Sequence, residues 1–161
     1  MDYLQQLTLH RRELHKIPEV NRELPKTKAY LRSVLDTLDC EITEVMESGL
    51  CAYFDRGQET TTAYRADMDA LPVTEVNTHD YISCHEGNMH ACGHDAHMAM
   101  VLALAQYVDT QKDLPCNVLC VFQPAEETTG GAKEICETGV LEKYNVNRIF
   151  GIHMWPFAEA G

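Results

Sequence analysis

Metal-binding side chains are concentrated in one short stretch of the chain, Met89–His97. The stretch contains His90, Cys92, His94, Asp95 and His97. Thiolate, imidazole and carboxylate groups together are typical ligands of Zn²⁺ and related divalent ions. We therefore interpret the stretch as part of a metal site. The simpler alternatives are that Cys92 is another small buried thiol, and that His90 and His97 pack or support the ligands.

Further carboxylates and a histidine follow three segments that we predict to be strands. Asp67 and Asp69 come after the β-branched segment 60–65, and Glu126 and Glu127 after the apolar run 117–122. His153 lies near the end of the apolar segment 148–154. Parallel strands bring their carboxyl ends to one edge of a sheet, which is where ligands bind in open α/β folds.

Two alternatives for these carboxylates stay open. Asp67 and Asp69 are equally compatible with capping a turn, which Asp does often. The pair Glu126 and Glu127, followed by Thr and Gly, is also compatible with a solvated helix start. The metal-site interpretation of the pair is favoured because it directly follows an apolar run.

The number of candidate ligands exceeds what one catalytic ion uses. The candidates are Cys92, His94, Glu127, His153 and Asp67. A catalytic ion takes three protein ligands and keeps a position open for water, so a site with two ions fits the set better. Glu126 and Glu127 would diverge on an extended chain. One can then bind metal while the other acts as general base towards water.

Helical spacing predicts the elements at the start of the chain. Apolar residues recur through segment 2–16, and a second helix begins at Leu24–Pro25. We interpret His15 as a helix-end histidine that bonds to nearby backbone. Residues 42–54 form two short strands around a turn at Ser48–Gly49.

The middle and end of the chain alternate between helix and strand. A polar loop over 75–87 precedes the metal-binding stretch, and a long helix starts at or near His94, with Asp95 available as its cap. After the strand at 117–122, residues 132–137 start another helix, and 148–154 form a third core strand. The order predicts one α/β domain, 1–161, with helices on both faces of a mostly parallel mixed sheet.

Bulk composition excludes several classes of partner. The 161 residues carry a formal net charge of -12, which argues against nucleic acid and anionic membranes. No apolar run is long enough to cross a bilayer, and no export signal is apparent. The seven cysteines are an odd number, so we expect reduced thiols in a cytoplasmic protein.

The motifs together resemble the dinuclear-metal amidohydrolases. They are Arg11–Glu19, Tyr64–Pro72, His90–His97, Phe122–Glu127 and Gly151–Pro156, in that order. The resemblance spans nearly the whole chain. It is to the branch with hippurate hydrolase, N-acetyldiaminopimelate deacetylase and the auxin–amino acid conjugate hydrolases, which are related to aminoacylase-type peptidases.

The resemblance implies a role for each matching residue. Cys92 would be a thiolate ligand that bridges two ions, and His94, Glu127 and His153 would be further ligands. Glu126 would be the general base, and Asp69 the catalytic aspartate that orients the site. The chain has Asp67 where the peptidase relatives have a histidine, and Cys92 where they have a bridging aspartate, which leaves the part of Asp67 open.

The resemblance also implies that the family's longer members contain more than this chain does. They continue into a small lid and dimerisation domain and then supply a last histidine ligand. We therefore expect a homodimer for the full-length protein and little activity for the 161-residue chain alone.

The expected function is hydrolysis of an N-acyl amino acid by two divalent ions, with zinc, manganese and cobalt all compatible with the ligands. A metal-binding fragment without catalytic activity is the first alternative. The second is a thiol hydrolase with Cys92 as nucleophile and His94 as base. The sequence does not determine the acyl group.

Overall fold

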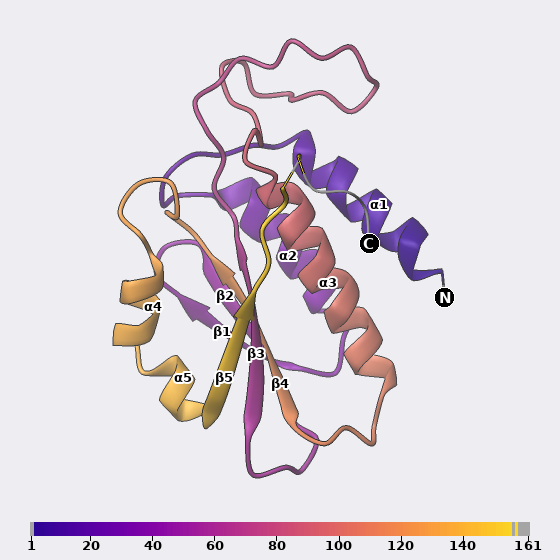
Figure 1. Ribbon diagram of the computed structural model, residues 1–161, viewed down its shortest axis with the longest axis vertical. Coiled ribbons are helices and arrows are strands. Elements are labelled where there is room, and N and C mark those ends of the chain that lie inside the picture. The colour runs from indigo at the N-terminus through magenta and orange to yellow at the C-terminus, as the bar shows by residue number, and fades with distance from the viewer. Residues whose placement is uncertain (1, 156, 158–161) are drawn as a thin grey trace.

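The computed structural model describes residues 2–155 and 157, which form a five-stranded mixed sheet with helices on both faces (Figure 1). The helices are α1 (Tyr3–His15), α2 (Pro25–Leu35), α3 (His94–Thr110), α4 (Ala132–Glu137) and α5 (Val140–Lys143). The strands are β1 (Glu41–Val45), β2 (Gly49–Phe54), β3 (Thr61–Asp67), β4 (Asn117–Gln123) and β5 (Val146–Gly151). The layered α/β fold predicted from the sequence is confirmed.

The strand order is β1-β2-β4-β3-β5, so β4 lies between β2 and β3. Strands β3, β4 and β5 are parallel, while β1 and β2 form an antiparallel hairpin that pairs with β4. The connection from β3 to β4 passes through α3, as parallel neighbours require a crossover. The carboxyl ends of β3, β4 and β5 therefore meet at one edge, as the sequence indicated.

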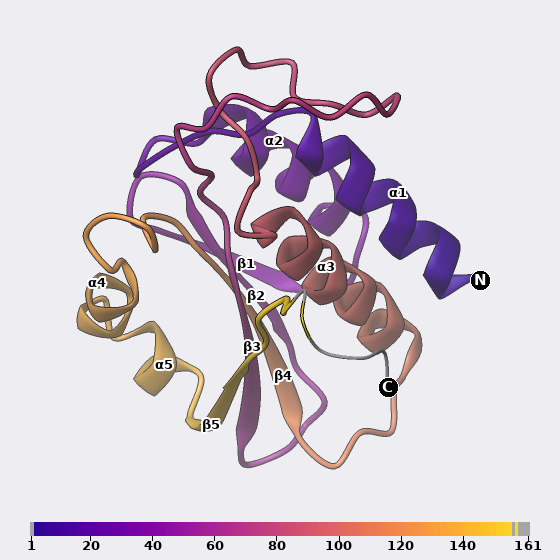
Figure 2. The ribbon, with the colours of Figure 1, turned by 45° about the horizontal axis from the view of Figure 1, so that its top comes forward.

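Helices α1, α2 and α3 cover one face of the sheet, and the short helices α4 and α5 cover the other (Figure 2). The first face buries the leucines of α2 and α3 together with Phe54 and Phe122. The second buries a smaller cluster that includes Ile135, Val140 and Tyr144. Strand β4, in the middle of the sheet, is buried at all seven positions.

Helix α3 is the element that fixes the metal-binding stretch against the sheet. It begins at His94, and buried residues occur on most of its circumference. The residue before it, Gly93, is the N-cap and has φ +85°, a conformation that favours glycine. The expectation that Asp95 caps this helix is wrong: no side chain caps it, and Asp95 bonds to residues of α1 instead.

Strand β5 differs from the sequence expectation in extent and in burial. It ends at Gly151, so His153 lies two residues past the strand rather than inside it. It occupies the sheet edge and is exposed from Asn147 onward, with Ile149 and Phe150 each 50% exposed. The prediction of a core strand failed because an apolar run does not say whether both sides of a strand are covered.

The segment after β4 also differs from the expectation. Glu126 and Glu127 lie in a turn, not in extended chain, and Ala125 before them has φ +60°. The turn follows the buried strand directly, and its backbone bends back towards the end of β3. The two glutamates consequently do not have to diverge.

The long loop between β3 and α3 is attached to the first half of the chain at several points. Leu71 and Met89 form an isolated antiparallel bridge at the base of the loop. The amide of Ala70 donates to the carbonyl of Glu19, and Nδ1 of His85 donates to the carbonyl of Pro18. The irregular loop predicted over 75–87 is confirmed.

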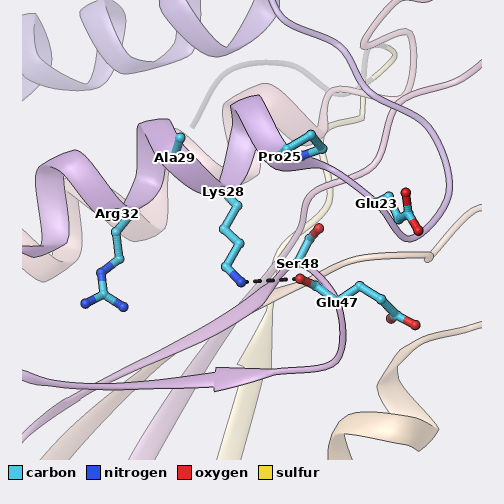
Figure 3. Close-up of a pocket in the computed structure, with 7 residues that line it drawn as sticks. All are labelled: Glu23, Pro25, Lys28, Ala29, Arg32, Glu47 and Ser48. Carbon is cyan, nitrogen blue, oxygen red and sulfur yellow. Dashed lines mark hydrogen bonds between the residues drawn. The ribbon is translucent and has the colours of Figure 1, made fainter.

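A cavity of about 610 Å³ lies between α2 and the turn after β1, and none of the candidate metal ligands lines it (Figure 3). Lys28 donates there to the carbonyl of Glu47 and to the carboxylate of Glu44, and Arg32 pairs with Asp36 and Glu44. Since both cations already have acidic partners, the cavity has no unpaired charge with which to hold an anion.

Two further observations concern the chain as a whole. All seven cysteines lie in the described part of the chain and have free thiols. Within the same residues, none of the helices combines the length and the apolar character that crossing a membrane requires.

Candidate metal centre

Side chains from three separate segments meet at the carboxyl edge of the parallel strands. Cys92, His94 and His153 place one potential ligand atom each within 4.8 Å of one another. His94 does the same with Glu126 and Glu127. His94 belongs to both groups, so the two clusters are adjacent. Four-coordinate sites of this chemistry have ligand atoms about 3.3 to 3.6 Å apart. Two pairs are near this spacing: Sγ of Cys92 and Nε2 of His153 at 3.4 Å, and Nε2 of His94 and Oε1 of Glu127 at 3.7 Å.

Asp69 connects two of these segments to the end of β3. Its carboxylate accepts the amide hydrogens of Glu126, at 2.9 Å, and of Glu127, at 3.0 Å. Its backbone carbonyl accepts Nδ1–H of His94 at 2.7 Å. Asp69 is fully buried. Burial raises the pKa of its carboxyl group, and the hydrogen bonds from the two amides oppose that effect.

Both histidines of the first cluster have a defined tautomer. His94 donates Nδ1–H to the Asp69 carbonyl, and His153 donates Nδ1–H to the carbonyl of Met154 at 2.8 Å. Each neutral ring therefore keeps a free lone pair on Nε2. In His153 that atom lies 3.4 Å from Sγ of Cys92. Fixing one ring nitrogen to a carbonyl is how proteins prepare the other for a metal.

Two buried polar atoms in the site have no hydrogen-bond partner among residues 2–155 and 157. They are Nε2 of His94 and Oε1 of Glu127, which lie 3.7 Å apart, too far for a hydrogen bond. Nearly all buried polar atoms in proteins have a hydrogen-bond partner or bind an ion, so two such atoms without either indicate a missing partner. A divalent cation between the two atoms would satisfy both. The residues therefore fit the metal that their chemical types suggest.

The electrostatic surroundings of Cys92 also favour a cation. Partial burial and the neighbouring Glu127, Glu126 and Asp67 carboxylates raise the pKa of its thiol to about 12. A catalytic thiol needs the opposite environment, because the thiolate is the nucleophile. Bound cations would neutralise these carboxylates and stabilise the thiolate as a ligand.

Asp67 and His97 are already paired with each other. Nδ1 of His97 donates to Oδ1 of Asp67 at 2.6 Å, and Nε2 of His97 accepts the amide hydrogen of Met154 at 2.8 Å. The second oxygen of Asp67 accepts a hydrogen bond from Arg65 at 2.7 Å and lies 3.6 Å from Nε2 of His94. His97 has no free nitrogen for a metal, whereas Asp67 faces the site with one oxygen.

His90 is not among the clustered ligand atoms of the described residues. Its ring is buried, and neither nitrogen has a partner among these residues. Burial lowers the pKa of His90 to about 4, so the ring is neutral. The expectation that His90 packs against or supports the metal ligands without binding the metal itself stays a prediction.

The structure brings together the residues singled out from the sequence as ligands, base and orienting group: Cys92, His94, Glu127, His153, Glu126 and Asp69. Sequence reasoning missed Arg65 as the partner of Asp67. The available signal was their spacing of two on a strand, which places both side chains on the same face.

Comparison with known proteins assigns the chain to a family. It is a metallohydrolase-type α/β domain by fold and site, and residues 63–161 match the model of peptidase family M20/M25/M40. The chain belongs to this family.

Several relatives match along the whole chain. An uncharacterized hydrolase of Staphylococcus aureus (strain bovine RF122) is 42% identical over 100% of this chain and 43% of its own length. An uncharacterized hydrolase of Staphylococcus epidermidis is 38% identical with the same coverage. The chain thus spans less than half the length of these relatives.

Solved structures show the same fold. The YXEP protein of Bacillus subtilis, described as a dinuclear metal binding peptidase from the M20 family, superposes with a TM-score of 0.90 at 36% identity. The match covers 96% of this chain and 44% of that chain. A tripeptidase from Staphylococcus aureus superposes with a TM-score of 0.68 at 16% identity, over 93% of this chain and 43% of that chain, which shows the fold alone.

We predict that replacing Asp69 by Asn weakens the whole centre. An amide side chain offers one acceptor oxygen, and its NH₂ group would face the second backbone amide. The Asp69→Asn variant should lose about 1–3 kcal/mol of unfolding free energy. Its affinity for Co²⁺ should fall roughly 10-fold or more. Urea unfolding and calorimetric titration measure the two effects, and wild-type Co²⁺ affinity in the variant would contradict the positioning of the glutamates by Asp69.

Proposed function

We propose that this chain is the metal-binding part of a hydrolase that cleaves the amide bond of N-acyl amino acids with two divalent ions. The observation that carries the proposal is the pair of buried atoms without a partner among the described residues, Nε2 of His94 and Oε1 of Glu127, of which His94 also clusters with Cys92 and His153. The assignment to the M20/M25/M40 family and the description of the Bacillus subtilis neighbour as a dinuclear metal binding peptidase support it.

The proposed ligands are Cys92, His94, Glu127 and His153. Sγ of Cys92 lies close to His94 and His153, and the carboxylate of Glu127 is near enough to raise the pKa of the Cys92 thiol. This position suits a ligand shared between two ions. Bound divalent ions supply Lewis acidity, which polarises a carbonyl group and acidifies water. Thiolate favours zinc in this role, and the carboxylates also accept manganese or cobalt.

Glu126 is the proposed general base. It lies beside the ligand Glu127 in the same turn, and its carboxylate reaches the His94 cluster while staying exposed to solvent. In hydrolysis, the Glu126 carboxylate would take a proton from the attacking water. It would then give that proton to the amide nitrogen as the C–N bond breaks, which releases a carboxylate and a free amino acid.

Asp69 orients both groups in this scheme. Because its two oxygens hold the amides of Glu126 and Glu127, it fixes the base and a ligand in one rigid turn. Its carbonyl simultaneously fixes His94. Such prior positioning lowers the entropic cost of bringing water and base together.

The N-acyl amino acid substrate rests on the resemblance to the hippurate hydrolase branch. The motif Tyr64–Pro72, with Asp67 in place of a histidine, and the presence of Cys92 are the residues that carry this assignment. We further propose a cytoplasmic homodimer for the full-length protein. The alternative of a metal-binding fragment without activity applies to the chain by itself, because it spans 43% of its relatives' length.

We predict that Glu126→Gln abolishes turnover without loss of metal. The amide cannot accept a proton, so hydrolysis of N-acyl amino acids by the full-length protein should fall by roughly 10²- to 10⁴-fold. Elemental analysis should find the metal content of the wild type. Glu137→Gln, an exposed change on α4, is the matched control and should keep full activity. Normal turnover by Glu126→Gln would refute the role of general base.

We also predict that chelators inactivate the full-length enzyme reversibly. Removing the ions removes the Lewis acid, and adding Zn²⁺ or Co²⁺ back should restore hydrolysis. A thiol hydrolase with Cys92 as nucleophile would keep its activity in chelator, and would lose it to a thiol-alkylating reagent whether or not metal is bound. An assay before and after chelation separates the two chemistries.

A further inference from the structure

A second buried polar cluster lies behind the candidate metal centre and plays no part in the chemistry proposed above. It consists of Arg11 and His15 on α1, Asp95 on α3 and Glu75 in the loop between β3 and α3. We call these four residues the His15 clamp. The side chains of His15, Asp95 and Glu75 are 2%, 1% and 4% exposed, and Arg11, at 32%, is the only one of the four that reaches solvent.

The contacts of the clamp run from α1 to both sides of the ligand-bearing segment. His15 Nδ1 contacts Oδ2 of Asp95 at 2.7 Å, and Arg11 Nε contacts the same oxygen at 2.9 Å. His15 Nε2 contacts Oε1 of Glu75 at 3.1 Å. Asp95 directly follows the candidate ligand His94, and Glu75 belongs to the loop that leads to Cys92.

The hydrogen bonds determine the charge of the His15 ring. Carboxylates only accept, so each ring nitrogen of His15 must carry a proton to bond its partner. The ring is then an imidazolium ion. Two anions, Asp95 and Glu75, face two cations, Arg11 and His15, and the buried group is neutral overall. Burial alone would disfavour the charged ring, but the hydrogen bonds to Asp95 and Glu75 outweigh it and raise the pKa of His15.

Glu75 carries the constraint further into the loop. Its carboxylate also accepts the side-chain amide of Asn77 at 2.9 Å and the backbone amide of Ser83 at 2.6 Å. The aromatic ring of His79 lies against Tyr81 with centroids 3.9 Å apart, and Arg11 and Arg12 lie over the Tyr81 ring. Nε2 of His79 also lies 3.3 Å from Oε1 of Glu75, so the loop is folded around this buried carboxylate.

We infer that the His15 clamp sets the position of the segment Cys92–His94, and that His15 is a positioning residue for the metal centre. Helix α3 has no side-chain cap at its first turn. On the sheet side, the Asp69 carbonyl holds His94 and the Asp67 carboxylate holds His97 of the same turn. The clamp supplies the opposing attachment, and the inference rests on the proposed metal centre.

The test is a Co²⁺ titration of the full-length protein and its His15→Gln variant, followed by absorption spectroscopy. A thiolate–Co²⁺ charge-transfer band reports coordination by Cys92. Glutamine is neutral and cannot bridge two carboxylates, so the variant should bind Co²⁺ roughly 10-fold or more weakly and give a weaker or shifted band. Asp95→Asn should have the same effect, and the double variant should be no worse than either single one.

A control variant separates positioning from simple loss of stability. Leu31→Ala creates a cavity in the core under α2, which contributes no residue to the clamp, and should destabilise the fold while keeping Co²⁺ affinity within about twofold of wild type. Wild-type affinity and band in His15→Gln would overturn the inference. Loss of one whole ion by His15→Gln with an unchanged thiolate band would also overturn it, since the clamp would then be a metal site itself. A wild-type protein without any thiolate band would instead refute the proposed function.

Discussion

The carboxylate of Asp69 is the constraint on which the arrangement of the site depends. It lies just past the end of β3, fully buried, and both oxygens are used by the backbone amides of Glu126 and Glu127. Its own carbonyl holds the His94 ring. A single residue thus connects the end of β3 with the turn after β4 and with the start of α3. Burying a carboxylate is costly unless its acceptors are satisfied, and here the satisfying groups are the segments that carry candidate ligands.

The sheet makes this connection possible. Parallel pairing of β3 with β4 and β5 brings three chain segments to the same edge, and the crossover through α3 places the Cys92–His94 segment above it. Past the strands, the polypeptide becomes irregular: a turn at Glu126 and Glu127, a left-handed Gly93, and the coil that holds His153. Regular structure supplies the rigid base, and the irregular segments at its edge supply the candidate ligand side chains.

Much of this could be predicted from the sequence, for physical reasons that differ between elements. The helix start at Leu24–Pro25 and the strand at 117–122 were predicted correctly, because proline favours the first turn of a helix and a short apolar run bounded by polar residues favours a strand. The edge position of β5 could not be predicted, because Ile149 and Phe150 are as apolar as core residues and only the strand order shows that one side is uncovered. The partners of His15 and Asp95 lie 60 to 84 positions away in the chain, so no local pattern identifies them. Cys92, His94, Glu127 and His153 could be singled out as candidate ligands because their chemical types are rare in such combination, and the structure places them near one another.

The central claim is that these four side chains bind divalent ions together. A crystal of the full-length protein grown with Zn²⁺ and measured at the zinc absorption edge tests it directly, because anomalous scattering locates the ions without assumptions about the ligands. The account predicts two peaks, with Sγ of Cys92 and Nε2 of His94 within about 2.0 to 2.3 Å of an ion and Glu127 and His153 completing the set. Anomalous peaks elsewhere, or none within bonding distance of Cys92, would contradict it.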